Sequence, residues 1–133
     1  MATRFDPADL PPEVLAFLAE RHVAALTTLR PDGSPHVTPV GFTYDPASGL
    51  ARVITFARAW KVRNLQAGPA SRAAVCQVDG RRWLTLEGPA TATSDPARNA
   101  EGTTRYAARY RTPKDRADRV TIEIAVDRIT GSA

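Results

Sequence analysis

Cationic and polar side chains gather in the segment that follows residue 50. Two guanidinium groups, a hydroxyl, an ammonium and an amide occur there, in Arg52, Thr55, Arg58, Lys61 and Asn64. Such groups near the N-terminus of a short helix can bind phosphate, because the helix amides and dipole add to the side-chain charge. Arg52 and Thr55 face opposite sides of an extended strand, so not all five can converge. The segment predicts an anion site, and the alternative is an ordinary solvated basic face.

Residues for several other reaction classes are missing from the sequence. His22, His36 and Cys76 are isolated from one another along the chain, so their spacing resembles no zinc or iron site and no metal is expected. Neither a Gly-x-Ser-x-Gly elbow, a Walker A loop nor a Gly-x-Gly-x-x-Gly fingerprint occurs. We therefore expect no nucleophilic catalytic residue and neither of the common nucleotide-binding folds.

Length and charge limit the remaining possibilities. The chain has 133 residues, which fits one domain spanning residues 1–133. Its formal net charge is +4, and Lys61 and Lys114 are its only lysines among 18 basic residues. Arginine suits bidentate capture of phosphate or carboxylate, so an anionic small molecule is a plausible partner. The few aromatic residues are not interleaved with basic ones, so no nucleic acid is expected.

The sequence also predicts where the protein works. Its longest apolar run covers only residues 14–19, far short of the roughly 20 residues that a membrane-spanning helix needs. The N-terminus lacks the apolar stretch and cleavage site of a secretory signal. A single cysteine offers no disulfide framework, so we expect a cytoplasmic protein with no membrane association.

Periodicity predicts three helices and six strands. The first helix is capped by Asp9 and runs to about Glu20, the second covers 60–67 and stops at Gly68-Pro69, and the third opens at Asp95 and runs to about Tyr110. The strands are expected at 22–29, 35–44, 50–56, 71–78, 82–93 and 120–127. Strands joined mostly by hairpins predict a mainly β fold, a six-stranded antiparallel barrel with short flanking helices.

One place in the second expected strand is irregular. Pro39 lacks a backbone donor and Gly41 lacks side-chain bulk, on either side of Val40. The pattern indicates a bulge or a close approach of the backbone to a ligand. An edge strand that tolerates proline is the alternative.

Several segments together resemble a known family. They are residues 26–37, 39–42, 52–55, 61–65, 78–88, 105–113 and 120–124. They are similar to the split-barrel flavin-binding superfamily of pyridoxamine 5'-phosphate oxidase, and within it to the deazaflavin-dependent flavin/deazaflavin oxidoreductase B group of actinobacteria. The similarity is greatest to members that reduce biliverdin with coenzyme F420. The chain stops at Ala133 without the C-terminal substrate motif of true pyridoxamine phosphate oxidases, so vitamin B6 chemistry is not expected.

The resemblance implies a homodimeric split barrel with two cofactor sites at the subunit interface. The backbone of Pro39, Val40 and Gly41 would lie against the deazaflavin ring. The phosphate and linker would be held by Arg52, Thr55, Lys61 and Asn64, and tail carboxylates by Arg58 or Arg63. The partner subunit would contribute Gln77, Arg81 and Trp83 to each cofactor site. No side chain need act as a nucleophile, and solvent or an ordered water would deliver the proton.

The expected function is hydride transfer from reduced coenzyme F420 to a conjugated acceptor, biliverdin or a related tetrapyrrole. Trp60, close to the expected phosphate site, could reshape the pocket, so the substrate class transfers less directly than the cofactor. Two alternatives stay open. One is an FMN-dependent oxidoreductase of the same fold, and the other is a non-catalytic carrier of F420 or of a haem-related ligand.

Overall fold

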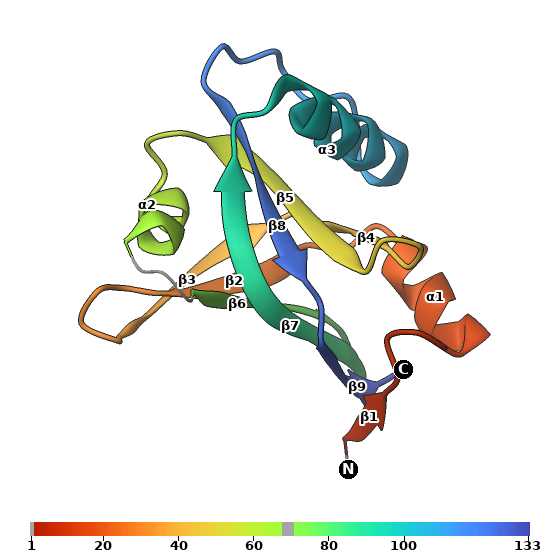
Figure 1. Ribbon diagram of the computed structural model, residues 1–133. Coiled ribbons are helices and arrows are strands. Elements are labelled where there is room, and N and C mark those ends of the chain that lie inside the picture. The colour runs from red at the N-terminus through yellow and green to blue at the C-terminus, as the bar shows by residue number, and fades with distance from the viewer. Residues whose placement is uncertain (1, 68–70) are drawn as a thin grey trace.

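The computed structural model describes residues 2–67 and 71–133, and in these residues nine antiparallel strands form one connected sheet. The strands are β1 (Thr3–Phe5), β2 (Ala24–Leu29), β3 (Pro35–Val40), β4 (Thr43–Asp45), β5 (Leu50–Phe56), β6 (Arg72–Asp79), β7 (Arg82–Thr93), β8 (Arg119–Ala125) and β9 (Arg128–Ser132). They pair in the order β3-β2-β6-β7-β8-β5-β4, and β9 joins β7 to β1 (Figure 1).

Strand β7 connects the two halves of the sheet. Its first part pairs with β6 and β9, whereas Ala90–Thr93 pair with β8. Gly88 lies where the strand passes from one half to the other, and a Cβ atom there would overlap the carbonyl oxygen of Ala125. Close backbone packing at this crossing therefore requires glycine.

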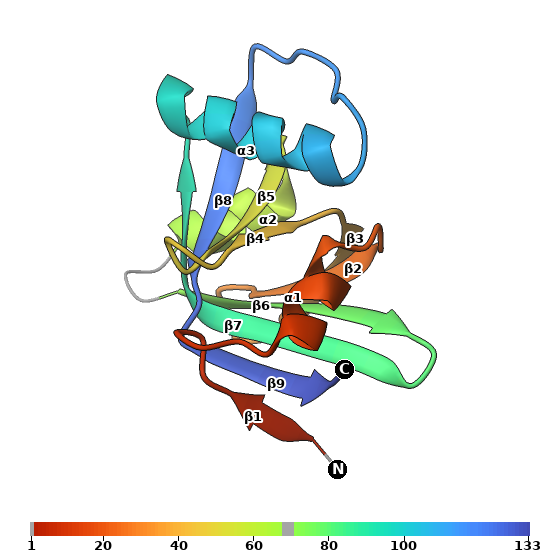
Figure 2. The same ribbon diagram turned by 90° about the vertical axis from the view of Figure 1, so that its right-hand side faces the viewer.

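Three helices flank the sheet: α1 (Pro12–Ala19), α2 (Trp60–Gln66) and α3 (Pro96–Arg109). Helix α3 lies across β5 and β8, and α1 and α2 lie on opposite sides of the view in Figure 1 (Figures 1 and 2). Helix α1 buries the side chains of Val14, Phe17 and Leu18 in the core, as their i, i+3, i+4 spacing predicts. The mainly β, antiparallel fold class with three helices is confirmed.

The prediction of six strands in a closed barrel is wrong. The path of paired strands ends at β3 on one side and β4 on the other, and these two strands are not paired with each other in the described residues. Two strands at the termini were missed, because β1 has only three residues and β9 contains Gly131, so neither shows a clear alternating pattern. The single strand expected at 35–44 is divided at Gly41 into β3 and β4.

The predicted helix starts had different outcomes. The carboxylate of Asp95 accepts a hydrogen bond of 3.0 Å from the backbone N–H of Arg98, so the predicted cap of α3 is confirmed. The predicted cap of α1 by Asp9 is wrong, because the N-cap position is Pro11 and no side chain caps it. The predicted stop of the second helix at Gly68-Pro69 lies outside the described residues. No helix in the described part of the chain is both long and apolar enough to span a bilayer.

Candidate functional site

A cavity of about 410 Å³ lies between the end of β3, helix α2, helix α3 and the loop that follows α3. One wall is the chain at Pro39, Val40 and Gly41, and the ring of Tyr106 on α3 also lines it. Pro39, Val40 and Gly41 are the residues that the sequence marked as irregular or as close to a ligand. The irregularity in the second strand therefore borders a cavity.

The rest of the lining is strongly basic. Four cationic side chains contribute to it, those of Lys61, Arg111, Lys114 and Arg119, and no aspartate or glutamate is among the described lining residues. Burial lowers the pKa of Lys61 from its usual value, because the charged ammonium loses solvation. An anion placed here would restore that lost solvation and meet no like charge. The lining therefore suits phosphate or carboxylate groups.

Arg119 fixes the shape of the loop that carries two of these cations. Its Nη2 donates a hydrogen bond of 2.6 Å to the carbonyl oxygen of Lys114, and its Nη1 donates to the carbonyl of Thr55 at 3.4 Å. One side chain thus links the loop to β5 and still lines the cavity. The loop's backbone is held in place on the side of β5.

Gly41 allows the chain to pack closely against α3. A Cβ atom at this position would lie 2.9 Å from Cε2 of Tyr106 and 3.1 Å from Cε2 of Tyr110. The two tyrosine rings contact each other with centroids 5.0 Å apart. The close approach at this glycine is made within the chain, to a pair of aromatic rings. The predicted approach of this backbone to a ligand stays a prediction. β3 is also a terminal strand of the path, so the edge position that tolerates Pro39 is present too.

Four predicted site residues meet at the cavity, namely Pro39, Val40, Gly41 and Lys61. Arg52 lies elsewhere. Its side chain is 8% exposed, its Nη1 is 3.9 Å from Oδ2 of Asp45, and its Nε is 3.9 Å from Oε2 of Glu123. Glu123 in turn is paired with Arg98 on α3 at 2.7 Å. Arg52 is thus enclosed in an ion-pair network that joins the sheet to α3.

Two further predicted residues have partners inside the protein. The amide of Asn64 donates a 3.0 Å hydrogen bond to the hydroxyl of Thr28, and both side chains are buried. Gln77 is fully buried, with its Nε2 donating to the carbonyl of Phe17 at 3.0 Å and its Oε1 accepting from Arg109 at 2.8 Å. Their amides are used to hold elements of one chain together.

The other predicted residues do not line this cavity. Thr55 is buried in β5, and Arg58 is exposed between β5 and α2. Arg81 is exposed in the turn between β6 and β7, and Trp83 is half-buried at the start of β7.

Sequence reasoning missed Tyr106, Arg111, Lys114 and Arg119 as lining residues. A signal was present in the spacing of Tyr106 and Tyr110, which places both rings on one helix face. The position of that face against Gly41 depends on long-range packing, which spacing does not reveal.

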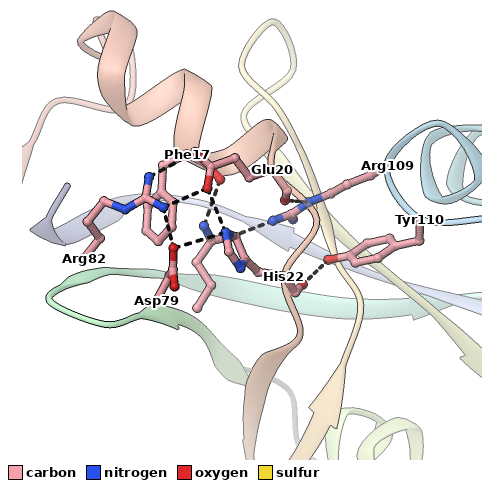
Figure 3. A network of polar contacts seen from close by, with 8 residues as sticks. Phe17, Glu20, His22, Asp79, Arg82, Arg109 and Tyr110 are labelled. Atoms are coloured by element: carbon pink, nitrogen blue, oxygen red, sulfur yellow. Dashed lines mark hydrogen bonds and ion pairs between the residues drawn. The ribbon is translucent and has the colours of Figure 1, made fainter.

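A second polar cluster lies where the end of α1 meets the end of β6 and the start of β7 (Figure 3). Ligand atoms of Glu20, His22 and Asp79 lie within 4.8 Å of one another, as in a metal site. The guanidinium of Arg82, however, is 2.8 Å from Glu20 Oε1 and 2.5 Å from Asp79 Oδ2. Hydrogen bonds from Arg82 and then from His22 lower the pKa of Glu20 to about 2. Arg82 balances the two acids, so we interpret the cluster as a structural ion-pair network.

Comparison with known proteins places this geometry in context. The chain is 51% identical over 121 residues to a protein of Mycobacterium tuberculosis named F420H(2)-dependent biliverdin reductase, covering 91% of this chain and 87% of that protein. A solved structure titled F420 Reductase is 28% identical, with a TM-score of 0.68 and coverage of 90% of this chain and 98% of that one. A conserved hypothetical protein of Mycobacterium tuberculosis is 24% identical with a TM-score of 0.75, covering 91% of this chain and 82% of that one, and shares the fold.

The family assignment rests on most of the chain. The sequence profile described as pyridoxamine 5'-phosphate oxidase matches residues 10–133, which include every residue found to line the cavity. Together with the 51% identical relative, this match confirms the resemblance read from the sequence motifs. The chain belongs to the pyridoxamine 5'-phosphate oxidase family.

Proposed function

We propose that this protein is an oxidoreductase that uses reduced coenzyme F420 to reduce a conjugated acceptor, biliverdin or a related tetrapyrrole. The observation that carries the proposal is the cavity lined by Lys61, Arg111, Lys114 and Arg119 without a described acidic residue. The 51% identical relative named F420H(2)-dependent biliverdin reductase supports both the cofactor and the acceptor.

The cavity's donors fit the chemistry of the cofactor. Coenzyme F420 carries a phosphate and a tail of glutamate carboxylates, which are anions of the kind that guanidinium and ammonium groups bind. Lys61 and Arg111 would hold the phosphate, and Lys114 would meet the carboxylates, with Arg119 holding the loop that carries Lys114. The half-buried ammonium of Lys61 gains from such a partner, since burial already disfavours its charge when no anion is near.

The protein's own part in the reaction is to bind and orient the cofactor and to shield it from water. When bound, the reduced deazaflavin supplies the hydride, so the chain needs no nucleophile of its own. The backbone of Pro39, Val40 and Gly41 would border the ring, and Tyr106 would exclude water from one side of it. Solvent would bring the proton to the reduced acceptor.

The set of cofactor-binding residues that we propose is smaller than the sequence-based set. Asn64 and Gln77 are left out, because their amides bond to partners within the protein. Arg52 is left out, because it lies beside Asp45 and Glu123 and does not line the cavity. Thr55 and Arg58 stay predictions that the cavity does not support. Arg81 and Trp83 stay predictions that require a partner subunit.

We also propose a homodimer that works in the cytoplasm. The exposed face of β2, β3 and β6 carries Val23, Val37 and Val78, which are 69%, 57% and 59% exposed. Apolar side chains grouped in this way are typical of an interface. Pro39 lines both this face and the cavity, so a second subunit seated there would lie beside the cofactor. The single cysteine supports a reducing compartment.

Fluorescence titration with F420, and separately with FMN, tests the function. We expect tighter binding of F420, weakened by salt because the contacts are ionic. Each of Lys61→Gln and Arg111→Gln should weaken F420 binding about tenfold, the value of one charge-assisted hydrogen bond. Arg4→Gln, in β1 and outside the cavity lining, is the matched control and should bind like the wild type.

Three other results would change the assignment. Preference for FMN would favour the flavin-dependent alternative. Tight F420 binding without biliverdin reduction would favour a carrier. Wild-type affinity in both the Lys61 and Arg111 variants would contradict the proposed cavity.

A further inference from the structure

The C-terminal end of α3 is fastened to three other segments by a single arginine (Figure 3). Arg109 donates from Nε to the carbonyl of Glu20 at 2.8 Å, from Nη1 to the carbonyl of Phe42 at 2.5 Å, and from Nη2 to Oε1 of Gln77 at 2.8 Å. Its guanidinium also lies 4.7 Å from the centre of the Phe42 ring. The end of α1, the β3–β4 junction and β6 therefore meet at this one side chain.

The acceptors of Arg109 are all uncharged oxygens. Burial lowers the pKa of this guanidinium from its usual value, yet an arginine stays protonated at any pH at which the protein is folded. A half-buried cation held by two carbonyls and an amide depends on the fork-shaped arrangement of its donors rather than on a carboxylate. A lysine at this position could keep the charge but not the three contacts.

The next residue makes a second connection to the same junction. The hydroxyl of Tyr110 lies 2.7 Å from the carbonyl of His22, which takes its only proton. The hydroxyl oxygen of Tyr110 also accepts a hydrogen bond of 3.2 Å from the backbone N–H of Phe42. The Tyr110 ring also packs against Gly41. Phe42 is thus held at its carbonyl by Arg109 and at its N–H by Tyr110.

These two residues lie between cavity-lining groups without lining the cavity themselves. Tyr106 precedes them by one helical turn and Arg111 follows directly. Their partner Phe42 follows Gly41, the last residue of the opposite wall. We propose that Arg109 and Tyr110 are positioning residues that hold the wall at residues 39–41 in register with Tyr106 and Arg111, and so set the affinity for the anionic cofactor.

This proposal rests on the proposed function, because the affinity in question is that for F420. The proposal predicts a rise in Kd for F420 that a simple loss of stability does not produce. Well below the melting temperature nearly all of the chain stays folded, so a modest loss of stability leaves the midpoint of the F420 titration unchanged. Displaced cavity walls raise that midpoint while the folded fraction stays near one.

The test uses the full-length chain with Arg109→Lys and Tyr110→Phe, titrated with F420 and assayed with F420H2 and biliverdin. We expect Kd and KM for the cofactor to rise about tenfold in Arg109→Lys and about threefold in Tyr110→Phe, because more hydrogen bonds are lost in the first. The titration amplitude should stay at the wild-type value. Arg105→Lys is the matched control, an α3 arginine whose ion pairs are with Glu101 and Asp45.

Two results would overturn the proposal. If Tm falls while Kd and KM stay at wild-type values, the two residues only stabilise the fold. Tyr110→Phe removes a single oxygen. Should the arginine variant fail to fold, Tyr110→Phe alone decides between a positioning role and a purely stabilising one. If the wild-type chain does not bind F420 at all, the proposed function fails first, and the positioning role fails with it.

Discussion

Two cations that are close in the sequence have different roles in this protein. Arg52 on β5 lies opposite the carboxylates of Asp45 and Glu123 and is enclosed beneath α3. Lys61 at the start of α2 faces a cavity in which no described acid opposes it. Both residues matched the same pattern of basic side chains. What separates them is whether the fold places carboxylates near the charge: two lie 3.9 Å from the Arg52 guanidinium, and none lines the cavity beside Lys61 in the described residues.

The lowered pKa of Glu20 predicts how the stability of the protein changes in acid. Hydrogen bonds from Arg82 and His22 lower its pKa from 4.5 to about 2. A carboxyl whose pKa is lower in the folded state contributes stability that is fully present above its unfolded pKa and is lost as the pH falls through its folded pKa. In thermal melts, we expect Glu20→Gln to lower Tm at neutral pH. The difference from wild type should shrink between pH 4.5 and about 2.

The exposed Glu13 of α1 provides the control for this measurement. Glu13→Gln has no comparable partner to lose, and its Tm should follow that of the wild type over the same range. A constant difference between wild type and Glu20→Gln at every pH would contradict the assigned role of the ion-pair network.

At the scale of elements, local signals were reliable where the contact that they predict is itself local. The β5 strand has the predicted bounds, and α3 begins directly after its predicted cap. The strand expected at 35–44 divides at Gly41, because that glycine packs against tyrosines far along the chain. The sequence marked the irregular position but not the residues responsible for it.

The two predicted helix caps give a test at this scale. Asp95→Ala should lower the free energy of unfolding by about 1 kcal/mol, because the N–H of Arg98 loses its acceptor. Asp9→Ala should change it far less, since that carboxylate does not cap α1. Urea unfolding measures both, and Asp95→Asn, which keeps an acceptor oxygen, should restore most of the loss. Equal losses in the two alanine variants would contradict the assignment.

At the scale of the whole molecule, the sheet leaves one apolar face without a cover in the described residues. Exposed valines of β3 and β6 and of the residue before β2 share this face, which continues to Pro39 at the cavity. The face and the cavity therefore border each other. In the proposed homodimer, a second subunit would cover the face and lie beside the cavity.

We expect Val78→Asp to convert a dimer to a monomer in sedimentation velocity, because a carboxylate buried in an apolar interface is costly. F420 affinity should fall in the same variant if Arg81 and Trp83 act across the interface. Leu15→Asp on α1, another exposed apolar position, is the control and should leave the dimer intact. A wild-type chain that sediments as a monomer would refute the proposed assembly.

The sequence by itself determined the family, the antiparallel β class, the three helices and four of the residues that line the cavity. These depend on periodicity, on turn and cap chemistry, and on motifs that are contiguous in the chain. It did not determine the open nine-stranded sheet, the ion pairs of Arg52, or the four lining residues from α3, its following loop and β8. Those depend on which distant segments pack together, because a charge or a ring acquires its role only from the group that the fold places opposite it.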